Sequence, residues 1–136
     1  MKILILITTI LAVASCKPDY ATLDDVYADV MVSVEKQFPD AEYFLTKTQT
    51  GALVLSPTII LNDVYDDEWV IMGVQLMYAH MGITLDDGLR WDEGEGLWRS
   101  EFFYKNIRIE TTYIPDDVVS RMRIILQDMS YYDDLF

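Results

Sequence analysis

The chain has very few of the residues that build disulfides and transition-metal sites. Among its 136 residues there is one cysteine, Cys16, and one histidine, His80. No disulfide can therefore close within the chain, and zinc sites made of several cysteines or of two histidines are excluded. Folding stability has to come from burial of apolar side chains, for which a hydrophobic share of 51% is ample.

Motifs of catalysis and of phosphate binding are missing as well. None of the serines lies in a G-x-S-x-G elbow, and no glycine-rich loop resembles a phosphate-binding one. Met81 follows His80 at the position where the H-E-x-x-H helix of zinc peptidases carries its glutamate, so we interpret His80 as a residue at a helix end. We predict no catalytic residue, no metal site and no cofactor, and hence a protein that is not an enzyme.

Two acidic segments, residues 86–88 and 92–96, leave weak calcium binding open. Hard cations prefer several oxygen ligands from a flexible loop, but the spacing of these carboxylates does not match the EF-hand loop. Acidic hairpin loops are the simpler interpretation. The same carboxylates leave a hydrolase that uses an acid and a base as a further alternative, although any acidic protein offers such pairs.

Positive charge is scarce and unevenly placed. Ten Lys and Arg residues stand against 23 Asp and Glu residues, a net charge of −13, and there is no basic residue between Lys47 and Arg90. The acids of this interval that we consider as candidate partner-binding residues are Asp63, Asp66, Asp67, Glu68, Asp86 and Asp87. A charge of this size repels nucleic acid and favours basic partners. It either keeps the domain soluble, which is the simpler interpretation, or forms an acidic face for a basic protein.

The first sixteen residues have the composition of an export signal. One lysine, Lys2, precedes an apolar run from Ile3 to Ala14, which is shorter than the roughly 20 residues that cross a bilayer. The motif Val13-Ala14-Ser15-Cys16 resembles the lipobox of bacterial lipoprotein precursors, and the resemblance covers residues 1–16 only. It implies cleavage before Cys16, a lipid on its sulfur and anchoring in a membrane. Cleavage after Ala14, which would release a protein without a lipid, is the alternative.

The lipobox and the chain length together suggest how the chain is organised. We expect a signal peptide over residues 1–15, a lipidated tether over 16–21, one globular domain over 22–130 and an acidic, aromatic tail over 131–136. Cleavage leaves 121 residues (136 − 15), enough for one core, and a net charge of −14 because Lys2 is lost (−13 − 1). The expected location is the bacterial cell envelope, at a membrane. The absence of aspartate after Cys16 favours the periplasmic face of the outer membrane.

Hydrophobic periodicity predicts three helices. In the first, apolar residues recur every three or four positions from Leu23 to Phe38, after the N-cap Thr22. The second runs from about residue 64 or 66 to 81, can be capped by Asn62-Asp63 and is apolar on most sides, so it should be the most buried helix. The third begins at Pro115 and is indicated by apolar residues at helical spacing, which are Val118, Met122, Ile125 and Met129.

The remaining segments predict strands, so the expected fold is α+β, a small single domain of helices on an antiparallel sheet. Strands are expected over residues 43–46 and 51–55, with Pro57 at an edge or a bend. A hairpin is expected near 97–113. If Lys105-Asn106 is its two-residue turn, the numbers of facing residues sum to 211, which places Phe102 opposite Ile109 and Glu101 opposite Glu110. Residues 89–91 are expected to add a third strand.

Size, charge and the lipobox favour a protein that binds rather than catalyses. The main hypothesis is an inhibitor or immunity-type lipoprotein that neutralises a basic enzyme or toxin of the envelope. The partners expected are thus the membrane, through lipid on Cys16, and a basic protein, but no nucleic acid. One alternative is an accessory of an envelope assembly, in which the tail and the exposed aromatics Trp91 and Phe103 would matter more. The carboxylate-based hydrolase remains the third.

Overall fold

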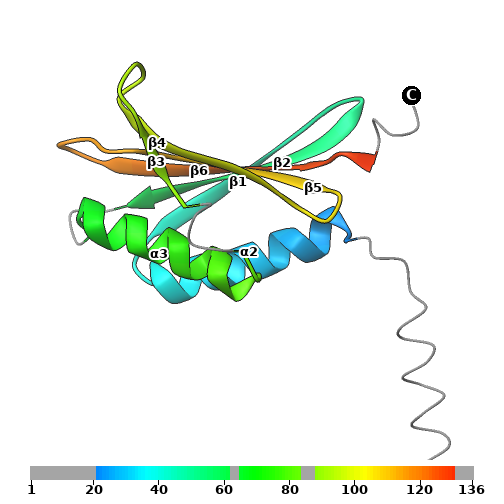
Figure 1. Cartoon of the computed structure of the whole chain (residues 1–136), viewed down its shortest axis with the longest axis horizontal. Helices are drawn as coiled ribbons and strands as arrows, with labels where there is room; N and C mark the ends of the chain where they lie inside the picture. The colour runs from blue at the N-terminus through cyan, green and yellow to red at the C-terminus, as the bar shows by residue number, and fades with distance from the viewer. Residues whose placement is uncertain (1–20, 62–64, 84–87, 131–136) are drawn as a thin grey trace, which may run out of the picture.

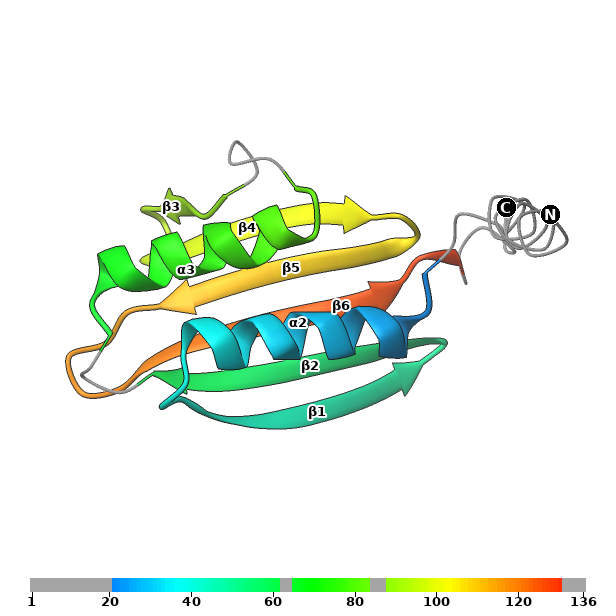
Figure 2. The ribbon, with the colours of Figure 1, turned by 90° about the horizontal axis from the view of Figure 1, so that it is seen from below.

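The computed structural model describes residues 21–61, 65–83 and 88–130, and within them two helices cover one face of a six-stranded antiparallel sheet (Figures 1 and 2). The helices are α2 (Leu23–Gln37) and α3 (Asp67–His80). The strands are β1 (Glu42–Thr50), β2 (Ala52–Leu61), β3 (Arg90–Asp92), β4 (Leu97–Tyr104), β5 (Ile107–Ile114) and β6 (Ser120–Asp128). They lie in the order β1-β2-β6-β5-β4-β3. The α+β class and the antiparallel sheet are therefore confirmed.

Several predictions fall on residues outside the described ranges. These are the signal peptide, Cys16 and the tether up to residue 20, the acids Asp63, Asp86 and Asp87, and the tail over 131–136. They stay predictions.

The first helix forms as its sequence indicates. Thr22 Oγ1 accepts a hydrogen bond from the Asp25 N–H at 3.2 Å, which satisfies one of the free donors at the start of α2. The buried stripe of α2 contains Val26, Val30 and Val34, and Phe38 closes the helix with its side chain in the core.

The second helix also forms, but its cap and its burial differ from the prediction. Asp66 is the N-cap, and its Oδ1 accepts the Trp69 N–H at 2.8 Å. The expectation that this helix is the most buried is wrong. Val70, Val74 and Met77 face the core, but three large apolar side chains on another side of α3 are at least half exposed.

The predicted third helix is wrong, because its residues form a loop and then β6. β6 lies between β2 and β5 and pairs with both. Met122, Ile124 and Leu126 are completely buried and alternate with Arg121 and other partly exposed residues, which is the period of a half-buried strand. The helical interpretation skipped Ile124 and Leu126. Hydrogen bonds to β2 and β5 stabilise the strand more than the favourable helix start after Pro115 stabilises a helix.

The predicted hairpin has the predicted register. Tyr104 faces Ile107, Phe102 faces Ile109 and Glu101 faces Glu110. Lys105 adopts a positive φ of 56° in the two-residue turn. β3 extends this hairpin, with Trp91 opposite Trp98.

The first hairpin, β1–β2, is longer than expected and turns at Gly51, whose φ is 105°. Pro57 lies inside β2, which is flanked by β1 and β6, so an edge position is wrong. Pairing of β2 with β6 nevertheless skips Ser56 and Pro57, consistent with the missing N–H of proline.

The core lies between the helices and the sheet. The sheet contributes fully buried side chains such as Ile59, Ile109 and Met122. Within the core, the hydroxyl groups of Tyr78 and Thr111 are hydrogen-bonded to each other. Burial raises the pKa of Tyr78. At Gly73, α3 packs tightly against Phe38 at the end of α2, because a Cβ placed on it would lie 2.7 Å from Phe38 Cζ.

This contact predicts the sign of one substitution. Gly73→Ala should lower the free energy of unfolding by about 1–3 kcal/mol through overpacking against Phe38. Inside an unconstrained helix the same change would raise it by about 1 kcal/mol. Urea denaturation of the purified variant measures the difference. Phe38→Leu in the same chain should reduce the penalty, whereas an unchanged or increased stability of Gly73→Ala would contradict the packing argument.

Candidate functional site

The outer surface of the helices carries an exposed apolar patch. Trp69, Met72 and Leu76 follow one another on α3 at steps of three and four residues, so they share one side of the helix. Their exposed fractions are 56%, 61% and 50%, and Val32 on α2 is 65% exposed. We call these four residues the helix patch. Exposed apolar residues that gather in this way on a small protein mark a binding surface more often than scattered ones do.

A shallow groove between the helices connects the two parts of the helix patch. Val32 from α2 and Leu76 from α3 both line it, together with Lys36, Met77 and His80, and its volume is about 450 Å³. At the other end of the patch the indole N–H of Trp69 donates to the Gln37 carbonyl at 3.3 Å. This bond lays the Trp69 ring across the gap between the two helices.

Acidic residues border the helix patch. On α2, Asp29 and Glu35 lie three residues before and after Val32, hence on the same side of the helix, and both are exposed. On α3, Glu68 is exposed and directly precedes Trp69. Lys36 is the nearby cation, beside His80 in the groove.

Three of the six acidic residues predicted to bind a partner lie in the described part of the chain. Asp66, Asp67 and Glu68 are together at the start of α3, whereas the other three lie outside the described residues. Two of the carboxylates have partners inside the domain. Asp66 caps α3, and Asp67 Oδ1 accepts a hydrogen bond of 2.5 Å from the hydroxyl of Tyr113 on β5. Of these three described candidates, Glu68 is the one that directly precedes Trp69 and lies exposed beside the helix patch.

The opposite face of the sheet, which neither α2 nor α3 covers (Figure 2), collects every arginine of the chain. Residues directly opposite one another in a sheet share a face, and the register places Arg90 beside Arg99, Arg99 beside Thr112, and Thr112 beside Arg123. Arg108 and Arg121 fall on the same face by alternation. The sequence showed these residues in the last third of the chain, but only the register of four strands brings them together.

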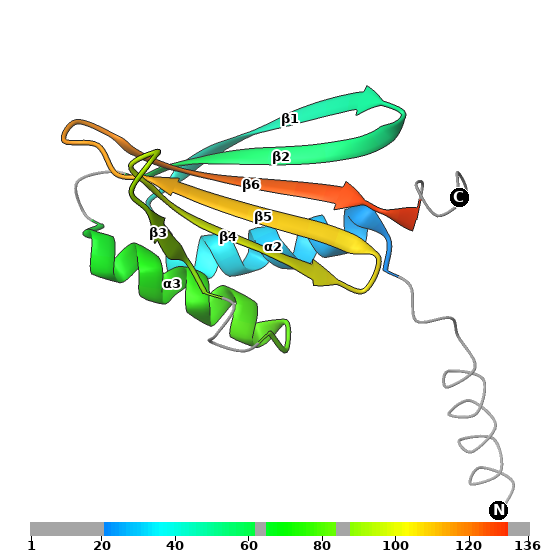
Figure 3. The ribbon, with the colours of Figure 1, turned by 45° about the horizontal axis from the view of Figure 1, so that its top comes forward.

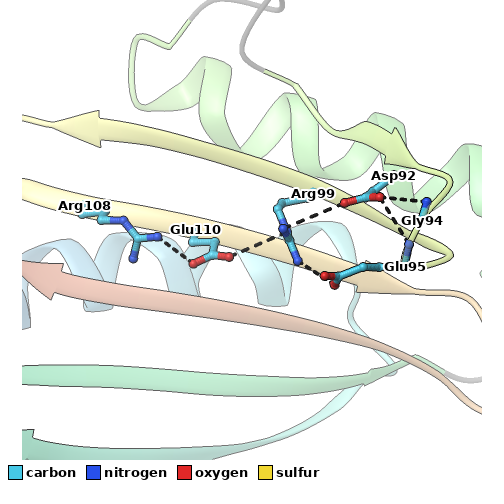
Figure 4. Close-up of polar contacts among 6 residues, drawn as sticks. All are labelled: Asp92, Gly94, Glu95, Arg99, Arg108 and Glu110. Atoms are coloured by element: carbon cyan, nitrogen blue, oxygen red, sulfur yellow. Dashed lines mark hydrogen bonds and ion pairs between the residues drawn. The ribbon is translucent and has the colours of Figure 1, made fainter.

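Glu110 connects two of these arginines on the open face (Figure 4). Its carboxylate lies 2.8 Å from Arg108 Nη2 and 3.8 Å from Arg99 Nε. Arg108 also bonds Glu101 at 2.6 Å, so it offsets the repulsion between Glu101 and Glu110, which face each other across β4 and β5. Partial burial alone would lower the pKa of Arg108, but the hydrogen bonds to both glutamates outweigh it and raise the pKa.

The loop between β3 and β4 is organised by Asp92. Its Oδ1 accepts the N–H groups of Gly94 and Glu95 at 3.0 and 3.2 Å, and its other oxygen lies 3.9 Å from Arg99. Arg99 also bonds Glu95 at 3.0 Å. These carboxylates, considered above for calcium, are thus bonded within the protein. In the part of the chain that is described, no three Asp, Glu, His or Cys residues are arranged to hold a metal ion.

Two arginines on β6 differ from Arg99 and Arg108. Arg121 and Arg123 have no carboxylate partner among the described residues. Arg123 Nε donates to the hydroxyl of Ser56 at 3.0 Å. Arg121 and Arg123 thus form a small positive area on the open face of a strongly acidic protein.

Comparison of the chain with protein-family models, curated proteins and solved structures gives no match. Over residues 21–61, 65–83 and 88–130 no helix combines the length and the apolar character that crossing a bilayer requires. The exposed surfaces of the domain are therefore what indicates its function. Sequence reasoning missed the helix patch, although a signal was present, since a helix that is apolar on most sides can be explained by a partner as well as by deep burial.

The ion pairs of the open face predict unequal effects of two similar substitutions. Glu110→Gln should lower the free energy of unfolding by about 1–2 kcal/mol, because this half-buried carboxylate serves two guanidinium groups. Glu101→Gln, at a more exposed position, should cost less than about 1 kcal/mol. Denaturation in low and high salt measures both. Equal losses would contradict the assignment of Glu110 as the connecting residue.

A second prediction concerns alkaline pH. Burial, together with the hydrogen bond to Asp67, raises the pKa of Tyr113 to about 12. Its contribution to stability is full below pH about 10 and is lost as pH rises towards 12, because the unfolded tyrosine ionises first. Unfolding free energy measured across this range should fall less steeply in Tyr113→Phe than in the unchanged protein. An identical slope in both would show that Tyr113 is not held in its protonated form.

Proposed function

We propose that this protein is a lipid-anchored binding protein of the bacterial cell envelope and that it holds a basic protein partner on the helix patch. The observation that carries the proposal is the exposure of Trp69, Met72 and Leu76 on a helix whose other sides are already packed. Burying one such side chain fully in an interface is worth about 1.5–3 kcal/mol. A partner that covers the patch gains this energy.

The arrangement of the patch resembles the anatomy of protein interfaces. Such interfaces have an apolar centre, in which tryptophan often dominates the binding energy, and a polar border. Trp69 is the largest side chain of the patch, and its ring is already positioned by the hydrogen bond to Gln37. A side chain that is ordered before binding loses less conformational entropy when the partner arrives.

The charge around the patch suggests the chemistry of the partner. Asp29, Glu35 and Glu68 border it, and the whole chain has a net charge of −13. Such a field accelerates encounter with a basic protein and excludes acidic competitors. An inhibitor or immunity-type protein that blocks a basic envelope enzyme or toxin fits these features. The acidic residues then act as the border of an apolar interface rather than as an acidic face by themselves.

Anchoring through Cys16 completes the proposal. The support is the lipobox resemblance of residues 13–16 and the position of the chain's one cysteine within it. Two or three acyl chains hold a protein on a membrane stably. Confinement to the envelope would also raise the local concentration of the protein around an envelope partner.

The proposal predicts which face of the domain contacts the partner. A photo-crosslinking amino acid at Met72 should link the protein to one basic partner in envelope extracts. Trp69→Ala should weaken binding to that purified partner by about 2 kcal/mol or more, which is about 30-fold in Kd. Phe103→Ala is the matched control, because Phe103 is 59% exposed but lies on the opposite face of the sheet.

The contribution of charge is tested separately. Glu68→Lys should weaken binding at low salt and have little effect at high salt, since the border acts through long-range attraction. Crosslinking from position 103 but not from position 72, or equal losses for Trp69→Ala and Phe103→Ala, would transfer the binding surface to the open face and favour the assembly accessory.

A further inference from the structure

The first described residue of the chain is held by the side chain of Asn106. The Ala21 N–H donates to Asn106 Oδ1 at 2.8 Å, and Asn106 Nδ2 donates to the Ala21 carbonyl at 3.1 Å. Both backbone groups of one residue are thus bound by one amide. Asn106 belongs to the turn between β4 and β5, which is 85 residues away in the sequence.

A second set of bonds fixes Asn106 itself. Its Nδ2 also donates to Asp128 Oδ1 at 2.9 Å, and its carbonyl accepts the Met129 N–H at 2.8 Å. Ser130 donates to the same Asp128 oxygen from its hydroxyl at 2.6 Å and from its N–H at 3.0 Å. Burial alone would raise the pKa of Asp128, but these hydrogen bonds outweigh it and lower the pKa. The carboxylate therefore stays ionised near neutral pH. We call this set of bonds around Ala21 the Asn106 clamp.

The clamp lies at one end of the domain. Figure 3 shows the start of α2, the β4–β5 turn and the end of β6 together at this end, which we call the clamp end. The β5–β6 loop, residues 115–119, lies at the opposite end (Figures 2 and 3). Strand β5 connects the two ends, and its eight residues span about 24 Å.

The chain before the clamp is short. Ala21 lies five positions after Cys16, and five residues reach at most about 18 Å when fully extended. A lipid on Cys16 therefore keeps Ala21 within that distance of the membrane surface. A short tether attached to a freely moving chain end would still allow the domain to lie on any side. When Ala21 is clamped, the tether leaves the domain at the clamp end, so this end stays within that distance of the membrane surface.

We propose that the Asn106 clamp orients the domain on its lipid anchor, with the clamp end directed at the membrane surface. We call this arrangement the oriented mount. This inference rests on the lipid anchor of the proposed function. Both helices run along the axis from the clamp end to the opposite end (Figure 2). The helix patch consequently faces sideways, parallel to the membrane plane, and the acidic start of α3 points away from the lipid.

The test measures how far each end lies from lipid. In the full-length lipidated protein the sulfur of Cys16 is blocked, so a cysteine introduced elsewhere is the one free thiol. Lys105→Cys labels the clamp end, and Val118→Cys labels the opposite end, where Val118 is 77% exposed. Each is coupled to a maleimide fluorophore. The proteins are placed in vesicles of phosphatidylethanolamine and phosphatidylglycerol that contain lipids with a nitroxide on the head group.

Strong quenching of the label at position 105 and little quenching at position 118 is the expected result. Asn106→Ala should reduce this difference, because the domain then turns about a loose tether. Ala21→Pro removes the clamped N–H and leaves every fully buried side chain unchanged, and should do the same if Asn106→Ala fails to fold. Similar quenching at both positions in the unchanged protein, or a difference that survives both substitutions, would overturn the mount.

The anchor and the mount fail in different ways. If Cys16 of the expressed protein reacts with maleimide and the protein does not float with the vesicles, the lipid anchor is wrong. If Cys16 is blocked and the protein floats, but positions 105 and 118 are quenched alike, the anchor stands and the oriented mount is wrong.

Discussion

The whole structure depends on strand β6, the last long element of the chain. It pairs with β2 on one side and with β5 on the other, so it joins the hairpin β1–β2 to the meander β3–β4–β5. Its pairing with β2 brings together residues such as Leu55 and Leu126 that are far apart in the sequence. The closure of so long a loop costs entropy, and completely buried side chains on the helix-facing side of β6 offset that cost. Without β6 the two helices would have no continuous sheet to cover.

Once the sheet is continuous, its two faces have different roles. The face under α2 and α3 is apolar and forms the core, and the open face carries arginine, glutamate, serine and threonine. Antiparallel sheets commonly divide their faces in this way. Here the division also separates charges in an acidic chain. The arginines gather on the open face, two of them bound by Glu110, while exposed acids border the helix patch on the other side.

The clamp end and the helix patch connect structure with the proposed function. Asn106 binds Ala21, where the tether leaves the domain. Both helices run along the axis between the clamp end and the opposite end of the domain (Figure 2). A binding surface on a clamped domain samples fewer orientations than one on a loose tether. In the proposed function, a partner that approaches along the membrane would then lose less rotational freedom on binding. In the proposed function, the clamp would thus set the orientation of the helix patch through residues that lie far apart in the sequence and outside the patch.

The sequence by itself determined the features that depend on neighbouring residues. The N-cap and apolar stripe of α2, the existence of α3 and the register of the β4–β5 hairpin all follow from local periodicity and from a two-residue turn. Tertiary structure decided the rest, because β6 is a strand only when β2 and β5 bind both of its edges. The same holds for the exposed side of α3, whose apolar residues are indistinguishable in sequence from those that face the core. The arginine face and the Asn106 clamp each join residues from three or more elements, and no local pattern encodes such distances.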